Sequence, residues 1–355
     1  MIQYSCSHGG VYSVNPRLVR VDFSSNINPL GISGNVLQIL RKNLPKLSSI
    51  YPDTEHKILK KKIMSYLDSG LTYDSISIGN GATELIYNFA RAFVRKQVIM
   101  PYPTFCEYEL ASRKMGAKIK HVPLRDWKLD VDRILEKTRN SDAIFLCNPN
   151  NPTGLYSYEL VEKLVEKIDH SIKILIDESF IEFVDQNKHP RSFIEKINEF
   201  RNTVVLRSMT KSFGLAGLRL GYSVSHPSTE KKISNNKITW NINGLAQLAG
   251  ITALDNLSHL RKARKIITAE RELMHDRINH NLCSFSAIKS DVNFYLIRLS
   301  HGRSRQIRDL LLKKFGILVR DCSDFKGMND KYIRVAVRIH DQNLELFDSL
   351  ESLDK

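Results

Sequence analysis

The chain has 355 residues, with 53 Lys and Arg against 38 Asp and Glu, so its formal net charge is +15 at pH 7. Hydrophobic residues make up 42% and aromatic residues 8%, which is enough apolar surface for a substantial core and excludes intrinsic disorder. No apolar run approaches the ~18 residues that cross a bilayer, and the first residues lack the hydrophobic stretch of a signal peptide. We therefore expect a cytoplasmic protein with no membrane partner, built as one large domain and a smaller companion.

The excess of basic residues allows two interpretations. Lys and Arg are spread through the chain, and the densest runs, Lys60–Lys62 and Arg261–Lys265, lie in helix-like sequence beside apolar residues. We interpret these runs as solvated helix faces, not as a nucleic-acid patch, and expect no nucleic-acid partner. A basic surface would also attract a small anionic substrate.

The five cysteines are scattered singly and form no CxxC pair. This spacing argues against a structural zinc site and against a disulfide framework, so we expect no metal. The positions are Cys6, Cys106, Cys147, Cys283 and Cys322.

The elements in chain order predict an α/β fold. We expect residues 1–35 to form an N-terminal arm that lies over another part of the molecule, because the stretch before residue 30 is rich in Gly, Asn, Ser and Pro. We expect residues 36–245 to form a large domain, in which short β-branched runs alternate with helical stretches from about residue 75 onward. Two of these runs, Ala143–Cys147 and Ile172–Ile176, are apolar almost throughout. Such runs are typical of strands covered on both faces, so we expect a large domain with a mostly parallel sheet.

Residues 246–355 predict a linking helix and a small α+β domain. The helical stretch that follows Asn243 reaches to about Leu282. Beyond it, NFYLIRL, ILVRD and YIRVAVRIH are typical of strands, whereas SRQIRDLLLKKFG and DQNLELFDSLESL are typical of helices.

The segment Ser208-Met209-Thr210-Lys211, followed by Arg219, is the most informative motif. Taken alone, Lys211 could be an ordinary surface lysine. A lysine between a hydroxyl three residues earlier and an arginine eight residues later could instead form an imine beside an anion site, with Ser208 and Arg219 holding a phosphate.

Three further features lie at strand ends. Asp177 closes an apolar strand, where a carboxylate is either a cap or salt-bridge partner, or a buried anion that keeps a heteroaromatic nitrogen protonated. The segment Asn148–Gly154 reads NPNNPTG, with more Asn-Pro steps than a plain turn requires. Gly79–Thr83 ends a strand and opens a helix, so its backbone N–H groups could receive a phosphate.

Together these motifs resemble the pyridoxal-phosphate-dependent enzymes of fold type I, the aspartate-aminotransferase fold. The resemblance spans most of the chain and implies pyridoxal 5'-phosphate as cofactor, Lys211 as the lysine that bonds to it and Asp177 as the partner of its ring nitrogen. It also implies a homodimer, because Tyr51 matches the tyrosine that reaches the neighbouring subunit's cofactor phosphate. The remaining cofactor contacts that it implies are Gly81, Ala82, Thr83, Ser208 and Arg219 at the phosphate, Asn151 at the ring hydroxyl and Phe105 stacked on the ring.

Two groups within this family act on phosphorylated substrates and are similar to the chain: the histidinol-phosphate aminotransferases and the threonine-phosphate decarboxylases of cobalamin biosynthesis. The opening HGG, followed by DFSSNINPLG, closely resembles the decarboxylase N-terminus, whereas the aminotransferase has a shorter NENP-like version. Aminotransferases of this fold also usually carry Tyr three residues after the ring-nitrogen Asp, and here that residue is Phe180. Phe180 could equally be a plain core aromatic, but we favour the decarboxylase and keep the aminotransferase as the alternative.

A small phosphorylated amino acid carries two anions, so it needs two cationic sites. Arg334 matches the arginine that binds the substrate carboxylate in this family. Arg320 and His8 are our candidates for the substrate phosphate, although the roles of the two arginines could be exchanged, and His8 could be a loose arm residue. Asn28 and Asn151 complete the expected substrate contacts. We do not expect a regulator with an added DNA-binding segment, since the sequence begins almost at the arm. We do not expect an inactive homologue either, because the lysine and aspartate positions are both filled.

Overall fold

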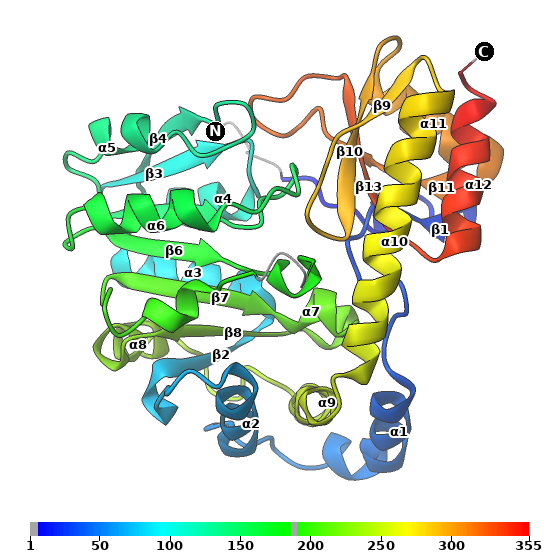
Figure 1. Ribbon diagram of the computed structural model, residues 1–355. Helices are drawn as coiled ribbons and strands as arrows, with labels where there is room; N and C mark the ends of the chain where they lie inside the picture. The colour runs from blue at the N-terminus through cyan, green and yellow to red at the C-terminus, as the bar shows by residue number, and fades with distance from the viewer. Residues whose placement is uncertain (1–5, 186–189, 355) are drawn as a thin grey trace.

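The computed structural model describes residues 6–185 and 190–354, and it contains a seven-stranded sheet in the order β2-β8-β7-β6-β5-β3-β4 (Figure 1). The pairings from β7 through β6, β5 and β3 to β4 are parallel, and β8 runs antiparallel to both of its neighbours. The α/β fold with a mostly parallel sheet is therefore confirmed. The strands are β2 (Ile76–Asn80), β3 (Gln97–Tyr102), β4 (Lys118–Pro123), β5 (Ala143–Cys147), β6 (Lys173–Asp177), β7 (Thr203–Ser208) and β8 (Leu220–Ser225).

Both faces of this sheet are buried, which explains why the middle residues of its central strands are apolar. Alternate residues of β5 and β6 belong to different cores: Ile144 and Ile174 point to one, and Phe145 and Leu175 to the other. The first core is covered by α1 (Gly34–Ser48), α2 (Lys57–Leu67), α5 (Val131–Glu136), α6 (Tyr158–Lys167) and α9 (Gly244–Asp255). The second is covered by α3 (Gly81–Phe93), α4 (Glu107–Lys114) and α8 (Pro227–Ser234).

A second, four-stranded antiparallel sheet follows the long helix α10 (Ser258–Asn281) and has the order β12-β13-β10-β9 (Figure 1). The helical stretch after Asn243 breaks at Asn256 and Leu257, between α9 and α10. The predicted ILVRD strand is divided into β11 and β12, because β11 pairs with the N-terminal arm and not with this sheet. The elements are β9 (Phe285–Ala287), β10 (Phe294–Leu299), β11 (Ile317–Leu318), β12 (Arg320–Asp321), β13 (Tyr332–Ala336), α11 (Ser304–Phe315) and α12 (His340–Glu351).

The N-terminal arm lies over other parts of the molecule, as its composition predicts. Its strand β1 (Val21–Asp22) pairs in parallel with β11, and the arm then continues to α1 at the other end of α10 (Figure 1). The side chain of Ser33 accepts a hydrogen bond from the backbone N–H of Val36 and so caps α1 where the arm ends.

One pair of cysteines corrects the expectation drawn from their spacing. Cys6 in the arm and Cys106, immediately before α4, form a disulfide with their Cα atoms 5.9 Å apart. The two residues are 100 positions apart in sequence, and they meet only because the arm folds back across the chain. Cys147, Cys283 and Cys322 are free.

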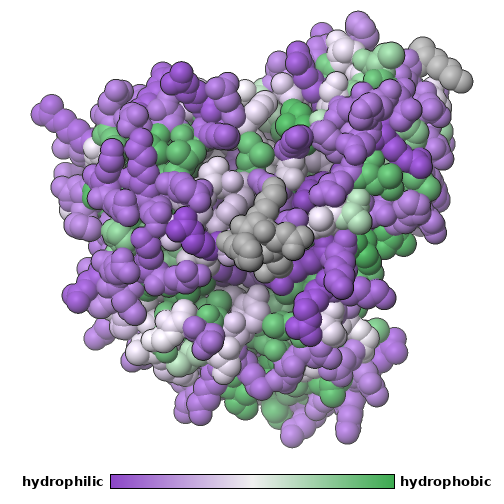
Figure 2. Space-filling model, in the orientation of Figure 1, coloured by the Kyte–Doolittle hydropathy of each residue, from purple (hydrophilic) through white to green (hydrophobic). Residues whose placement is uncertain are grey.

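Polar residues predominate on the molecular face in Figure 2, in keeping with the net charge of +15. In the described part of the chain, no helix is both long and apolar enough to cross a membrane.

Candidate active site

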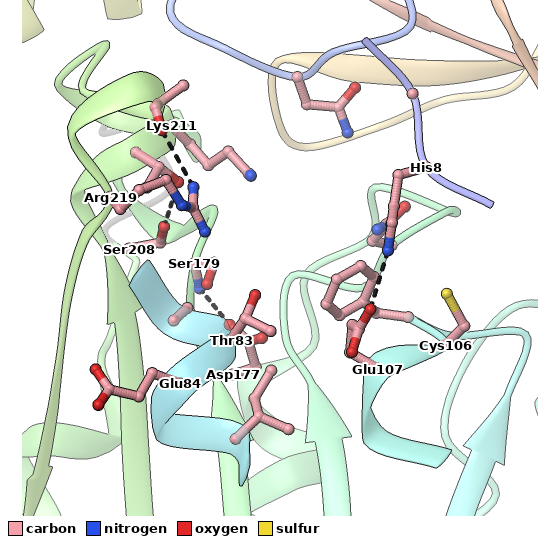
Figure 3. Close-up of a pocket in the computed structure, with 18 of the residues that line it drawn as sticks. His8, Thr83, Glu84, Cys106, Glu107, Asp177, Ser179, Ser208, Lys211 and Arg219 are labelled. Carbon is pink, nitrogen blue, oxygen red and sulfur yellow. Dashed lines mark hydrogen bonds and ion pairs between the residues drawn. The ribbon is translucent and has the colours of Figure 1, made fainter. Parts of the chain in front are cut away.

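A cavity of about 950 Å³ opens where the carboxyl ends of β5, β6 and β7 meet the start of α3, the N-terminal arm and the strands β12 and β13. Carboxyl ends of parallel strands are the usual place for a ligand in open α/β sheets. Figure 3 shows Lys211, Arg219 and Ser208 on one side of this space and His8 and Glu107 on the other, with Asp177 and Thr83 between them.

Lys211 lies in the short helix α7 (Met209–Ser212), which begins directly after β7 ends. Its side chain lines the cavity, and burial together with the positive charge of Arg219 lowers the pKa of its amine to about 8. The charge of Asp177 opposes this shift. A lysine with a lowered pKa supplies a neutral amine near physiological pH, which is the form that attacks a carbonyl.

Asp177 is the last residue of β6 and only 5% exposed. One carboxylate oxygen accepts a hydrogen bond from the Tyr108 hydroxyl at 2.7 Å. The other accepts one from the backbone N–H of Ser179 at 2.9 Å (Figure 3). Burial raises the pKa of Asp177, and the hydrogen bonds from Ser179 and Tyr108 oppose that shift. A buried carboxylate of this kind is suited to a cationic partner such as a protonated ring nitrogen.

The N-terminus of α3 faces Arg219 across a narrow space. Gly81 has φ +75°, and a Cβ there would lie 2.5 Å from Nη2 of Arg219, so this position requires glycine. Ala82 and Thr83 follow it at the positive end of the helix dipole. Among the described residues, Arg219 has no ion-pair partner. These groups form a cradle for a dianionic phosphate.

Hydroxyl groups complete this cradle. The side chains of Ser208 and Thr210 lie 2.6 Å apart and both line the cavity. Phe105 lies on the opposite wall, where its ring meets the ring of Tyr108 edge-on at 5.6 Å. The lysine, the carboxylate, the phosphate cradle and the aromatic wall together fit a phosphorylated pyridine aldehyde.

Two arginines of the small sheet reach the same cavity. Arg334 is 6% exposed; its guanidinium donates to Oδ1 of Asn151 and to the carbonyl oxygen of Ser24, while its Nε has no hydrogen-bond partner. Arg320 donates to both carboxylate oxygens of Asp324, at 2.8 and 2.7 Å. Burial lowers the pKa of Arg334 to about 10.

The arm places His8 at the edge of the cavity. Its Nε2 lies 2.9 Å from Oε1 of Glu107, and its ring is 5.9 Å from that of Phe105 (Figure 3). Glu107 also accepts a hydrogen bond from the Tyr87 hydroxyl at 2.9 Å. His8 is therefore held by a specific partner and is not a loose arm residue.

Three of the expected residues do not line this cavity: Asn28, Tyr51 and Gly81, which lies behind Arg219. Asn28 is 1% exposed, and its amide is committed to the carbonyl of Ser212 and the backbone N–H of Leu30, so it supports the segment that carries Lys211. Tyr51 is 79% exposed and stacks on Trp240 with ring centroids 4.7 Å apart, outside the cavity of its own chain.

Sequence reasoning missed several cavity residues. Asn26, two positions before Asn28, is 5% exposed, and its side-chain oxygen has no hydrogen-bond partner. Tyr108 and Glu107 were not singled out either, because a helix that begins after Phe105 carries no recognisable motif. Alternation of side chains along an extended arm would place Asn26 and Asn28 on the same face, so no local sequence pattern distinguishes the two.

This fold and this site define a pyridoxal-phosphate-dependent enzyme of fold type I. The chain belongs to the aminotransferase class I and II family, whose model matches residues 20–348, and its cofactor is pyridoxal 5'-phosphate. It is 35% identical over 334 residues, 93% of this chain and 89% of the relative, to a Caldanaerobacter subterraneus protein named "Putative threonine-phosphate decarboxylase".

Aminotransferases are similar to a comparable degree. The chain is 34% identical over 339 residues, 92% of this chain and 89% of the relative, to histidinol-phosphate aminotransferase 2 of Carboxydothermus hydrogenoformans. The crystal structure of the histidinol-phosphate aminotransferase from Clostridium acetobutylicum superposes with a TM-score of 0.87 at 30% identity, covering 94% of this chain and 99% of the other.

Proposed function

We propose that this enzyme removes the carboxylate of L-threonine O-3-phosphate as carbon dioxide and releases (R)-1-aminopropan-2-yl phosphate, a reaction of cobalamin biosynthesis. Phe180 is the observation that carries the proposal. It lies three residues after Asp177, lines the cavity and is 5% exposed. Its ring meets that of Phe294 edge-on at 4.9 Å and offers no hydroxyl to the cofactor's ring oxygen.

The positions of the cations support this substrate. The bond that breaks at the substrate's α-carbon is the one held perpendicular to the cofactor ring, so the anchoring of the two anions selects the reaction. Arg334 is a buried cation that lines the cavity and has no ion-pair partner among the described residues, which suits the substrate carboxylate. His8, with Arg320 beside the arm, is positioned for the phosphate.

Lys211 and Asp177 have separate roles in this scheme. When bound, pyridoxal phosphate supplies an electron sink for the electron pair left at the α-carbon. With the cofactor bound, Asp177 would hold a proton on its ring nitrogen and Phe105 would pack against its ring, while Nζ of Lys211 would return a proton to the substrate's α-carbon. The neutral amine favoured by the lowered pKa of Lys211 also allows it to release and recapture the cofactor.

Histidinol-phosphate aminotransferase activity is the alternative. The observation that favours it is the similarity to named aminotransferases at 30–34% identity, nearly as high as that to the decarboxylase relative. The same arm could bind the phosphate of either substrate, since both present a phosphate monoester.

Incubation of the enzyme with threonine phosphate and pyridoxal phosphate, without any keto acid, separates the two. We expect stoichiometric release of carbon dioxide and of the amino alcohol phosphate. Turnover that requires histidinol phosphate and 2-oxoglutarate, with no carbon dioxide from threonine phosphate, would establish the aminotransferase instead.

We infer that the enzyme is a homodimer in which Tyr51 serves the partner's site. Its exposed ring lies in an apolar group that is left open in the single chain: Ile50, Tyr51, Ile238 and Trp240. Sedimentation velocity of the holoenzyme should give twice the chain mass of 40.8 kDa, and a monomer would refute this.

A further inference from the structure

The N-terminal arm is attached to the start of α4 at two consecutive residues, Cys106 just before the helix and Glu107 at its first position. Cys106 forms the disulfide with Cys6, and Glu107 bonds to Nε2 of His8 at 2.9 Å. Both attachments directly follow Phe105, whose ring forms the wall of the active-site cavity. The disulfide therefore fixes one of the two stretches of the arm that line the active-site cavity.

The same part of the arm is bound from the opposite side by the small sheet. Arg320 donates from Nη2 to the carbonyl oxygen of Ser7 at 2.9 Å, and the Ser7 hydroxyl bonds to Asp324. Residues 6–8 thus bridge the start of α4 and the segment after β12, which are two walls of the cavity. Release of one anchor would leave this bridge with polar contacts alone.

We propose that Cys6 and Cys106 form a reversible latch, in which the disulfide holds the arm closed over the active site and reduction frees it. The proposal rests on the proposed role of His8 in binding the substrate phosphate. Reduction frees His8 from its fixed position beside Glu107, so the expected effect is on substrate affinity. No hydrogen bond or ion pair joins Lys211 or Asp177 to Cys6 or Cys106, which are all described residues, so the bond-breaking step should change little.

The exchange is a balanced thiol–disulfide reaction with a dithiol. One thiolate of the dithiol attacks a sulfur of the Cys6–Cys106 bond and expels the other cysteine as a thiolate. The second thiolate of the dithiol then attacks its own sulfur in the mixed disulfide and expels the remaining cysteine thiolate. Two electrons and two protons end on the cysteines, and the dithiol becomes a cyclic disulfide. A small-molecule disulfide reverses the reaction.

The location of the pair allows this exchange. Both cysteines are partly exposed, and both line a second cavity of about 180 Å³ beside the active site, which gives a small thiol access. The free cysteines differ: burial raises the pKa of Cys147 and of Cys322 to about 12, which leaves them as unreactive thiols, whereas Cys283 is exposed. Cys283 therefore provides a matched control.

Thiol chemistry tests the latch without reference to turnover. The air-equilibrated, denatured protein should show the three free thiols Cys147, Cys283 and Cys322, and five after treatment with a dithiol, with a Cys6–Cys106 cross-linked peptide in the non-reduced digest. Hydrogen exchange at the Gly10 amide, which donates to Oγ of Ser24 at 2.7 Å, should accelerate on reduction. Five free thiols in the air-equilibrated protein would overturn the proposal.

Kinetics of the holoenzyme test the consequence for the substrate. Reduction of the wild type, or the substitution Cys6→Ser without reductant, should raise KM for threonine phosphate about tenfold through loss of the tethered arm, with kcat within about twofold. Cys283→Ser should respond to the dithiol as the wild type does, and Cys6→Ser should not respond. If Cys6→Ser responded to the dithiol as strongly as the wild type, the latch would be refuted. A metal chelator that leaves disulfides intact but raises KM equally would also refute it, because that result indicates a cation held by Cys6, His8 and Cys106. If threonine phosphate is not turned over but the thiol and exchange results hold, the assigned substrate fails and the latch stands.

Discussion

Arg320 and Arg334 lie directly opposite each other on the antiparallel strands β12 and β13. Like charges at such cross-strand positions repel unless an anion compensates them. The Asp324 carboxylate compensates Arg320 at 2.7 Å, whereas Arg334 has no ion pair among the described residues. Arg334 is therefore the cation of this pair without a compensating carboxylate, whereas Arg320 pairs with Asp324 and also binds the arm segment that carries His8.

Arg334→Gln should lower kcat/KM about 100-fold, because the substrate carboxylate loses a charge-assisted, bidentate partner worth up to ~3 kcal/mol. Arg334→Lys should recover part of the loss, since it restores the charge without the fork of two N–H groups. Steady-state kinetics with threonine phosphate measures both. The matched control is Arg298→Gln, an exposed arginine of the neighbouring strand β10. Equal losses for Arg334→Gln and this control would show that Arg334 does not bind substrate.

Phe180→Tyr should lower the rate of carbon dioxide release and raise the fraction of turnovers that transfer the amino group. The new hydroxyl would stand at the cavity wall, where it can donate to the cofactor's ring oxygen as tyrosine does in the aminotransferases. Product analysis with and without 2-oxoglutarate measures this partition. Phe180→Leu removes the ring without adding a donor, so it should lower stability without changing the partition. If Phe180→Leu also raised the fraction of turnovers that transfer the amino group, the change in Phe180→Tyr would come from altered packing on Phe294 and not from its new hydroxyl.

Gly81→Ala should weaken pyridoxal phosphate binding at least tenfold. The added Cβ would lie 2.5 Å from Nη2 of Arg219 and would displace that cation from the phosphate cradle. Gly116→Ala is the matched control, since Gly116 has φ +76° but has no atom within 4 Å of an added Cβ. Both variants should lose about 1 kcal/mol of stability from backbone strain, but only Gly81→Ala should lose cofactor affinity in equilibrium titration. Equal cofactor affinities would remove Gly81 from the phosphate site.

Covalent capture of the cofactor by the apoprotein should accelerate as the pH rises and level off above about pH 8. Burial and the charge of Arg219 lower the pKa of Lys211 to about 8, and the amine attacks only in its neutral form. The growth of the visible absorbance of the lysine-bound cofactor measures the rate. Asp177→Asn removes the anion that stabilises the ammonium group, so its profile should move to lower pH. A profile that rises to pH 10 or beyond would contradict the lowered pKa.

The site residues that can be predicted from the sequence are those that lie at the ends of strands. Asp177 and Ser208 each end a central parallel strand, and such ends meet at one edge of a sheet whatever the loops between them do. Lys211 follows Ser208 within one short helix, so its placement follows from the same strand.

The part that does not follow from sequence depends on contacts between distant segments. Cys6 meets Cys106 because the arm crosses the cavity, and no local pattern records the direction of that crossing. Arg320 faces Arg334 because the predicted strand divides after Leu318, where β11 leaves the sheet to pair with the arm. Asn26 and not Asn28 lines the cavity, and this choice depends on how the arm is rotated against Lys211.

Glu230→Gln should stabilise the protein above neutral pH. Glu230 lies in α8, is 1% exposed and accepts a hydrogen bond from the Ser225 hydroxyl at 2.9 Å. Burial raises the pKa of its carboxyl from 4.5 to about 7, so between these values the folded protein holds a proton that the unfolded chain has released. The free energy of unfolding therefore falls as the pH rises from about 4.5 through 7, by up to ~3 kcal/mol, and stays low above that range.

Glutamine has the same shape and no charge to desolvate, so it should remove this pH dependence. Urea unfolding at pH 5 and pH 8 measures the difference: the variant and the wild type should be nearly equal at pH 5, and the variant should be more stable by up to ~3 kcal/mol at pH 8. Glu199→Gln, at an exposed position, is the control and should match the wild type at both pH values. A Glu230→Gln variant that is less stable than the wild type at pH 8 would show that the carboxylate is compensated by its hydroxyl partners and that its pKa is not raised.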